Sequence, residues 1–290
     1  MSKSAGIWAD HGNLLPDGLA PGTREWAGSA VFDPDTGILT LYFTSTGRRG
    51  DPFSFEQRMF EARTSLHVEG NQVALGEWSA PHELFSSDGD IYIDTRTTAG
   101  GAGLIKGFRD PGFFRDPADG RTYILFTGSD GRSSGSHNGV IGLAERMANG
   151  WQLRPPLISG DGVNNEFERP HIVRRDALYY LFWSTQRHVF HPDGPSGPNG
   201  LYGMVAESID GPYRRLNGTG LVAANPAAEP YQGYSWLVTA SLEVVSFIDL
   251  WGMKGRTRAT HPETLATQFG GTPALVLRIA LDGDRTSILT

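Results

Sequence analysis

Two glutamates, Glu166 and Glu168, stand two residues apart in the stretch NEFERP, residues 165–170. Successive side chains of an extended strand point to opposite faces, so these two carboxylates share one side if the segment is extended. Arg169 and Pro170 follow at once, and proline, which has no backbone donor, belongs at the first residue of a strand or on an edge. A carboxylate beside an arginine at a strand entrance can act as a general acid. A surface ion pair fits these residues equally well.

A second stretch, GFRDP, again combines an arginine, a carboxylate and a proline, here Arg109, Asp110 and Pro111. Each of the two stretches leads into a pair of short predicted strands joined by a turn. A third and more diverged copy starts at Trp26. The predicted strand pairs run over 26–32 and 39–44, over 113–115 and 122–127, and over 171–174 and 177–184, the last pair around a tight turn at 175–176.

These three copies continue into further strands, which gives units at 26–80, 109–160 and 168–224, and a last unit is predicted over 231–281. Strand repeats at roughly 50-residue spacing are typical of propeller blades. We therefore predict an all-β propeller, with a short helix expected only near 262–268 and a polar loop over 254–271. The first strand of each blade lines the central channel, so Trp26, Asp110 and Glu168 are expected to meet in one pocket.

Composition narrows the class of protein. The 290 residues include 38 Gly and 18 Pro, which fits many short strands and turns, and we predict one domain over 1–290. The net charge of −7 argues against nucleic acid or an anionic membrane as a partner. The absence of cysteine excludes disulfides and thiolate chemistry. No apolar run approaches a membrane span, and the start of the chain lacks the apolar core of a signal peptide.

Several other chemistries find no support in the residues. The eight histidines form no metal-binding pattern, no glycine-rich phosphate loop is present, and Ser235 lacks the second glycine of a nucleophile elbow. What remains is a set of carboxylates, arginines and aromatic rings around a channel. That set suits sugar chemistry, with carboxylates for acid/base work and rings against the apolar faces of a sugar.

The ordered motifs resemble glycoside hydrolase family 68, the group of levansucrases, inulosucrases and bacterial β-fructofuranosidases, and most of all its Gram-negative branch. The motifs that carry this resemblance are LPDG at 15–18, EWAGS at 25–29, FRDP at 108–111, NEFERP at 165–170, Arg187, DGP at 193–195, GLYG at 200–203, YS at 234–235 and VSFID at 245–249.

The resemblance implies a five-bladed propeller, of which this chain would supply about four blades. It also implies cleavage of sucrose with retention, through a covalent fructosyl-enzyme, and transfer of the fructosyl unit to water or an acceptor sugar. Glu168 would be the general acid/base and Asp110 the transition-state stabiliser. Members of the family are usually extracellular or periplasmic, and no cofactor is implied.

The resemblance also implies a set of binding residues. Trp26 and Ser29 would line the fructosyl site, Arg109 would stand beside Asp110, Arg187 would bind the glucosyl side, Glu166 would support Glu168, and Tyr234 would help to hold the carboxylates. Core positions for Trp26 and Tyr234, and an exposed position for Glu166, stay open as alternatives. Asn165 replaces an acidic residue that helps to bind calcium in Gram-positive members, so no metal is predicted.

One departure from the family concerns the nucleophile, an Asp directly after a Trp in the first blade. This sequence has no Trp-Asp pair, and Trp8-Ala9-Asp10 has the wrong spacing. The chain is then a fragment, has lost its chemistry, or is completed by another polypeptide. Open strand edges are avoided in solution, which favours the last. We expect the larger subunit of a split enzyme with a shorter partner. The alternatives are a non-catalytic sucrose- or fructan-binding propeller and a related arabinan- or xylan-acting glycosidase.

Overall fold

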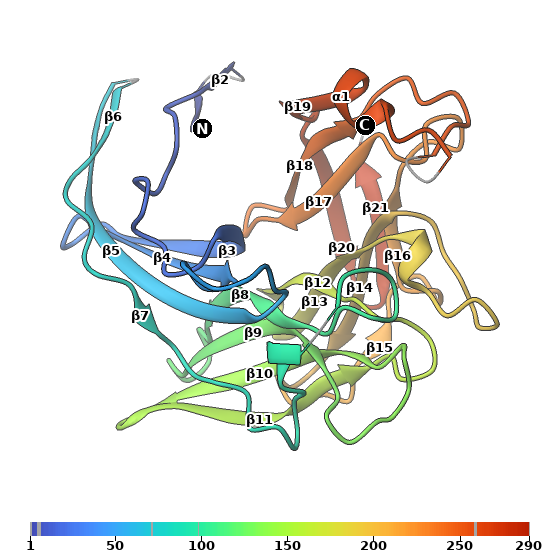
Figure 1. The fold of residues 1–290 in the computed structure, drawn as a ribbon, viewed down its shortest axis with the longest axis horizontal. Coiled ribbons are helices and arrows are strands. Elements are labelled where there is room, and N and C mark those ends of the chain that lie inside the picture. The colour runs from blue at the N-terminus through green and yellow to red at the C-terminus, as the bar shows by residue number, and fades with distance from the viewer. Residues whose placement is uncertain (1, 5–6, 71, 98, 258–259, 290) are drawn as a thin grey trace.

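The computed structural model describes residues 2–4, 7–70, 72–97, 99–257 and 260–289. Four antiparallel sheets follow one another around a central axis in chain order (Figure 1). Their inner strands pack in the same order, β3 (Arg24–Asp33) on β8 (Phe108–Arg115), β8 on β12 (Glu168–Arg175), and β12 on β17 (Gly233–Val238). The predicted all-β propeller with about four blades in this chain is confirmed.

The first two blades contain the strands that begin nearest the chain start. After β3, the first blade holds β4 (Ile38–Thr46), β5 (Gln57–Glu69), β6 (Gln72–Leu75) and β7 (His82–Glu83). After β8, the second holds β9 (Thr122–Ser129), β10 (Gly139–Met147) and β11 (Gly150–Ser159). A separate hairpin of β1 (Ser2–Ser4) and β2 (Ile7–Ala9) precedes them.

The third and fourth blades complete the part of the ring that this chain supplies. After β12, the third holds β13 (Leu178–Thr185), β14 (Gly200–Ala206), β15 (Arg214–Arg215) and β16 (Leu221–Ala224). After β17, the fourth holds β18 (Glu243–Leu250), β19 (Phe269–Pro273), β20 (Leu277–Asp282) and β21 (Arg285–Leu289). The helical pieces are η1 (Thr95–Thr97), η2 (Arg187–Val189) and α1 (Thr264–Thr267).

Two details differ from the expectations. The hairpin turn of the third blade is centred one residue later than predicted, on Asp176 and Ala177, which both have positive φ. Positive φ at both central residues matches the twist of the flanking strands. In addition, α1 forms where the short helix was predicted, but the end of the expected polar loop over 254–271 begins β19, which pairs with β18.

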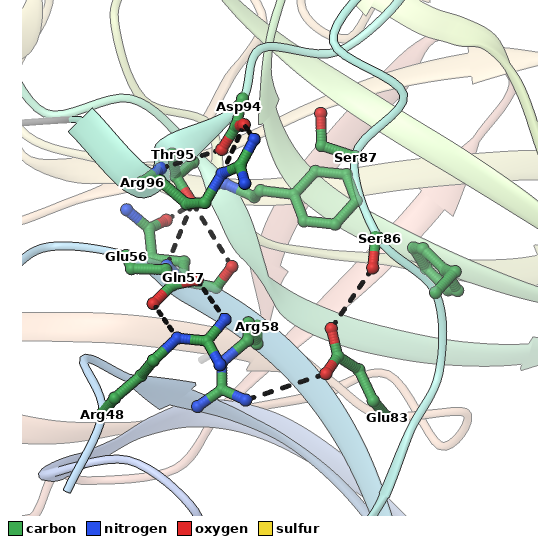
Figure 2. Close-up of a pocket in the computed structure, with 12 residues that line it drawn as sticks. Arg48, Glu56, Gln57, Arg58, Glu83, Ser86, Ser87, Asp94, Thr95 and Arg96 are labelled. Atoms are coloured by element: carbon green, nitrogen blue, oxygen red, sulfur yellow. Dashed lines mark hydrogen bonds and ion pairs between the residues drawn. The ribbon is translucent and has the colours of Figure 1, made fainter.

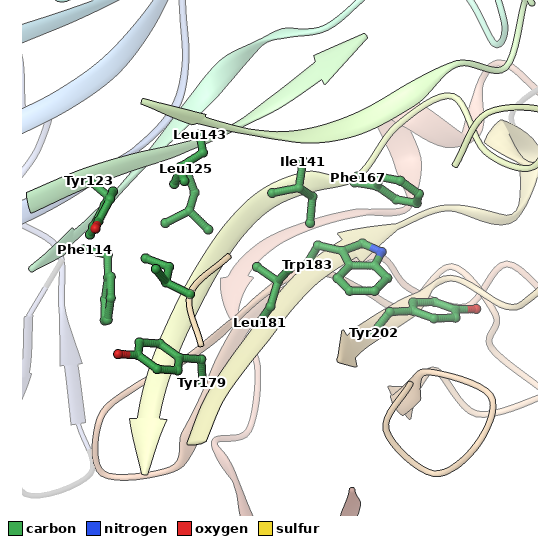
Figure 3. Close-up of a cluster of buried hydrophobic side chains, with 11 residues drawn as sticks. Phe114, Tyr123, Leu125, Ile141, Leu143, Phe167, Tyr179, Leu181, Trp183 and Tyr202 are labelled. Atoms are coloured by element: carbon green, nitrogen blue, oxygen red, sulfur yellow. The ribbon is translucent and has the colours of Figure 1, made fainter. Parts of the chain in front are cut away.

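The strand β13 shows why the blades stay together. Tyr179, Leu181 and Trp183 pack against the second blade (Figure 3), whereas the intervening Tyr180 and Phe182 pack towards the fourth. Side chains of a strand alternate between faces, so a sheet that is buried on both faces needs a continuous apolar run. The sequence LYYLFWST meets that requirement, and β9, with TYILFTGS, meets it one blade earlier.

Each inner strand also has a break in pairing near its start. Register shifts fall between Trp26 and Gly28, Arg109 and Gly112, Glu168 and His171, and Tyr234 and Leu237. In three of these breaks a non-glycine residue has positive φ, namely Asp110 at 61°, Arg169 at 54° and Ser235 at 63°. Such bulges redirect side chains, and they are common beside functional sites. They were not predicted from the sequence.

No helix in the described part of the chain is long and apolar enough to cross a membrane. Within the same residues, no group of three or more His, Cys, Asp or Glu side chains is placed to hold a metal ion.

His171 links the third blade to the fourth. Its Nε2 accepts a hydrogen bond from the Val238 backbone N–H at 2.9 Å, so the proton of the neutral ring lies on Nδ1, which donates to the Arg169 carbonyl at 3.0 Å. Burial lowers the pKa of His171 to about 4, although the bond to the Arg169 carbonyl opposes this shift.

The first prediction concerns acid stability. A histidine in the unfolded chain has a pKa near 6.5, whereas His171 in the folded protein has a pKa of about 4. Between these pH values the unfolded chain binds one more proton than the folded protein at this position. The free energy of unfolding therefore falls as pH drops from about 6.5 towards 4. Between pH 7 and pH 5 this group should cost about 2 kcal/mol of unfolding free energy. A His171→Asn variant should be less stable at pH 7 but lose less on acidification. Urea unfolding followed by tryptophan fluorescence measures both.

The exposed His67 provides the control, because His67→Asn should leave the pH dependence as it is. An equal loss of stability on acidification in wild type and His171→Asn would contradict the prediction.

Candidate active site

The heads of the first three blades meet at a cavity of about 380 Å³. Trp26 reaches it from β3, Asp110 from β8 and Glu168 from β12, although these residues are far apart in the sequence. The residues around the cavity are Glu25, Trp26, Ala27, Ile105, Arg109, Asp110, Glu166, Glu168 and Arg169.

Arg109 lies at the centre of this group, with its side chain only 3% exposed. Its Nη2 donates to Glu166 at 2.9 Å and to Glu168 at 3.1 Å, and its Nε lies 3.7 Å from Asp110 Oδ2. The two glutamates therefore do point to the same side, as their spacing predicts. Burial opposes the charge of Arg109, but the attraction of the three carboxylates outweighs it and raises the pKa of the guanidinium.

Asp110 is held by contacts from three blades. Its backbone N–H donates to Thr44 Oγ1 at 2.8 Å, and its Oδ2 accepts from the Arg169 backbone N–H at 3.2 Å. The Thr127 hydroxyl lies 3.0 Å from the same carboxyl oxygen. With Asp110 only 4% exposed, the contacts of its carboxylate with Arg169, Thr127 and Arg109 replace the water that it loses.

The pKa values of Asp110 and Glu168 are both raised. Burial is the main cause in each case; Glu168 adds repulsion at Asp110, and Glu166 does so at Glu168. Arg109 and Arg169 oppose these shifts without cancelling them. A carboxyl group that keeps its proton to higher pH is suited to general acid catalysis.

The spacing of the two groups fits a single substrate ring. Asp110 and Glu168 lie 3.7 Å and 3.1 Å from nitrogens of the same guanidinium. Since a guanidinium spans only a few ångströms, the two carboxyl groups are less than about 10 Å apart, which is the scale of glycosidase carboxylate pairs.

Glu166 and Trp26 both line this cavity. Glu166 is 8% exposed, so the alternative of an exposed carboxylate is wrong. Its backbone N–H donates to Asn164 Oδ1 at 2.7 Å, and its Oε1 accepts from Asn165 Nδ2 at 3.3 Å. Trp26 is half-buried at the cavity wall, with the Arg109 guanidinium 5.9 Å from its ring, and is not a core aromatic.

Three predicted binding residues lie outside the lining of this cavity. The Ser29 hydroxyl donates to the Pro111 carbonyl at 2.8 Å and accepts from the Phe113 N–H at 2.9 Å, so it ties β3 to β8. Arg187 is exposed in η2, where its backbone N–H donates to Asn199 Oδ1 at 2.7 Å. Tyr234 packs under Arg169, whose guanidinium lies 5.6 Å from the ring. Substrate contacts by these three residues stay predictions.

Two charged residues of the lining, Arg169 and Glu25, had no role assigned from the sequence. Arg169 lines the cavity, bonds Asp110 through its backbone and donates from Nη1 to Ser235 Oγ. Glu25 is the remaining carboxylate of the described lining; its side chain is 46% exposed and lies 3.9 Å from Arg49. In the sequence, Arg169 is next to Glu168 and Glu25 is next to Trp26, and this adjacency was the only hint that they belong to the site. The spacing of the residues did not tell in which direction either side chain points.

Comparison with known proteins identifies the family of this chain. The family profile described as Levansucrase/Invertase matches residues 1–140 and 137–289. The levansucrase of Erwinia amylovora is 34% identical over 314 residues, which cover 99% of this chain and 70% of the relative. The levansucrase of Zymomonas mobilis subsp. mobilis is 32% identical over 315 residues, with the same two coverages of 99% and 70%.

Solved structures share the fold. The inulosucrase from Halalkalicoccus jeotgali bound to kestose has a TM-score of 0.83 and 38% identity, over 94% of this chain and 71% of that chain. The levansucrase from Gluconacetobacter diazotrophicus, at 23% identity, shows the fold alone, with a TM-score of 0.75 over 96% of this chain and 66% of that chain. The profile match over both halves and relatives at 32–34% identity establish that this chain belongs to the levansucrase/invertase family, glycoside hydrolase family 68.

Proposed function

We propose that this chain supplies the acid/base and the transition-state stabiliser of a retaining, sucrose-cleaving fructosyltransferase and β-fructofuranosidase. The observation that carries the proposal is a single buried arginine that holds three carboxylates, two of them with raised pKa, beside a half-buried tryptophan. The named relatives, which are levansucrases and an inulosucrase, support sucrose as the substrate.

In the first step, protonated Glu168 donates its proton to the glycosidic oxygen as the bond to the fructosyl carbon breaks and glucose leaves. A carboxylate nucleophile attacks that carbon from the opposite face and forms an ester. Asp110 accepts hydrogen bonds from fructosyl hydroxyls, and these bonds strengthen as positive charge develops on the ring.

In the second step, Glu168 is ionised and takes a proton from water or from an acceptor hydroxyl. The oxygen of that acceptor attacks the fructosyl carbon, and the nucleophilic carboxylate leaves. Two inversions at one carbon retain its configuration. Arg109 keeps Glu168 in position through both steps while Glu168 changes protonation state.

We place the nucleophile on a second and shorter polypeptide that adds a fifth blade. A cavity of about 660 Å³ is lined by residues of β3 and β4 and by the segment 13–18, and it shares Glu25 and Trp26 with the carboxylate cavity. The fourth blade presents an apolar groove of about 400 Å³, where Leu237 is 50% exposed and Phe269 59% exposed. Uncovered apolar sheet surface of this kind favours a further sheet as its cover.

A propeller that binds sucrose or fructan without cleaving it is the second candidate. It is favoured by one observation, the lack of a Trp-Asp pair in the 290 residues. The two candidate functions can be distinguished by changing Glu168. In an enzyme, the loss of the acidic proton of Glu168 abolishes turnover. In a non-catalytic binding protein, the same change removes only one hydrogen bond to the sugar.

The second prediction tests the split arrangement. The chain is expressed alone and together with the product of the neighbouring open reading frame, and glucose release from sucrose is measured. We expect release only from the co-expressed pair. Full sucrose cleavage by the purified single chain would overturn the split arrangement, and loss of that activity in Glu25→Gln would then assign the nucleophile to Glu25.

The third prediction concerns Glu168 in the co-expressed pair. Glu168→Gln should lower kcat by about 10³-fold, within the range of general acid catalysis, and leave KM little changed. The exposed Glu77 provides the matched control, since Glu77→Gln should keep full activity. Sucrose binding without turnover in the wild-type pair would support the binding propeller instead.

The fourth prediction is a stability test of the same residue in this chain alone. Because the fold raises the pKa of Glu168, stability is lost as pH rises through the folded pKa, and an amide avoids that loss. Glu168→Gln should therefore melt a few degrees higher at pH 7.5 and gain nothing below the ordinary pKa of 4.5. Differential scanning calorimetry measures this.

Glu166→Gln is the matched control, because it removes a 2.9 Å ion pair with Arg109 and should melt lower at pH 7.5. A lower melting temperature for Glu168→Gln at both pH values would contradict the prediction.

A further inference from the structure

We infer that Gln57 is a positioning residue for the carboxylate cluster and that it acts by fixing the Arg109 guanidinium. Gln57 is the first residue of β5 in the first blade, and it is 2% exposed. The contact itself is independent of the reaction; its consequence for turnover rests on the proposed function.

Gln57 lies between two charged cavities. One is the carboxylate cavity; the other, of about 240 Å³, has Gln57 among its lining residues (Figure 2). The charges of this second cavity are matched among themselves. The ion pairs are Arg48 with Glu56 at 2.7 Å, Arg58 with Glu83 at 3.7 Å, and Arg96 with Asp94. A neutral side chain thus separates two sets of charged groups.

The Gln57 side-chain amide uses all its hydrogen-bonding capacity. Its Oε1 accepts from the Phe108 N–H at 3.0 Å and from Arg109 Nη1 at 3.4 Å. Its Nε2 donates to the carbonyls of Phe55 at 3.1 Å and Lys106 at 2.6 Å. Two donors and two lone pairs are all that a primary amide offers. The reversed orientation is excluded, because it would turn the NH2 group towards two donors.

The backbone of Gln57 is fixed as well. Its N–H donates to Thr95 Oγ1 at 3.0 Å, and Thr95 belongs to η1 at the edge of the second cavity. Gln57 is therefore anchored on both sides, and it passes that restraint to the second blade through Phe108 and Arg109.

Because the guanidinium of Arg109 is planar and rigid, the contact that Gln57 makes with it also affects Glu168. Nη1 of Arg109 contacts Gln57, while Nη2 bonds Glu166 and Glu168. Because a guanidinium is rigid, holding one nitrogen sets the position of the other. Without Gln57 the group can rotate, its hold on Glu168 weakens, and the carboxyl keeps its proton to higher pH.

The test replaces Gln57 by Met, which has similar size but no hydrogen bonds, in this chain alone. Glutamate side chains are labelled with ¹³C, Glu168 is assigned with Glu168→Gln, and its carboxyl is titrated by NMR. We expect the titration midpoint of Glu168 to rise by about half a unit or more in Gln57→Met, as expected when an ion pair weakens. Thr95→Val should raise the midpoint of Glu168 by a smaller amount. This variant replaces Gln57→Met in the test if Gln57→Met does not fold.

Thr46→Val is the matched control. Thr46 pairs with Gln57 across the β4–β5 ladder, and its buried hydroxyl is among the described groups that have no hydrogen-bond partner. This variant should leave the Glu168 midpoint unchanged. A purely structural role for Gln57 would lower the melting temperature and leave the midpoint in place, and that result would overturn the inference.

Sucrose cleavage by the co-expressed pair, measured together with the Glu168 midpoint, shows whether the positioning role of Gln57 or the proposed function fails. If sucrose is cleaved, Gln57→Met should move the alkaline limb of the kcat–pH profile upward together with the midpoint. A shifted midpoint in a pair that cleaves no sucrose would keep the positioning role and refute the proposed function. Cleavage with both the midpoint and the alkaline limb unchanged would refute the positioning role alone.

Discussion

The buried guanidinium of Arg109 is the interaction on which the site depends. Burial of a charge is tolerated only with close partners, and Arg109 has three carboxylates within 3.7 Å. One positive charge cannot neutralise three negative ones, and even with Arg169 beside them the three buried carboxylates keep an excess of negative charge. Burial is the main cause of the raised pKa values of Asp110 and Glu168, and repulsion between neighbouring carboxylates adds to it. A carboxyl group with a raised pKa is suited to donate a proton.

The blades must approach closely for one arginine to reach all three carboxylates. At Gly112 a Cβ would lie 2.2 Å from the Pro170 carbonyl oxygen, so only glycine allows β8 and β12 to come this near. The positive φ angles of Asp110 and Arg169 aim the inner side chains, and each such angle costs about 1–3 kcal/mol. The apolar packing between blades, such as that of β13 on both its faces, offsets this strain.

Periodicity was enough to predict the blades and the convergence of their first strands, because alternation and turn chemistry are local properties. The details of the site depend on contacts between blades. The bulges at Asp110 and Arg169 turn side chains away from the direction that simple alternation gives. Substrate contact by Ser29 stays a prediction, and the bonds of its hydroxyl to the neighbouring strand could not be read from the sequence. Gln57 carries no motif, and only the meeting of two blades gives it a role.

The excess negative charge also bears on how a nucleophile would join this site. Retaining glycosidases place their two carboxyl groups about 5–5.5 Å apart, so an incoming carboxylate would repel ionised Glu168 and raise its pKa further. Arrival of the nucleophile and protonation of Glu168 therefore favour each other. In the proposed mechanism, formation of the ester would remove the charge of the nucleophile and lower the pKa of Glu168, which would suit Glu168 to act as a base. Because Arg109 would stay charged in both steps, the protonation state of Glu168 would follow the state of the nucleophile.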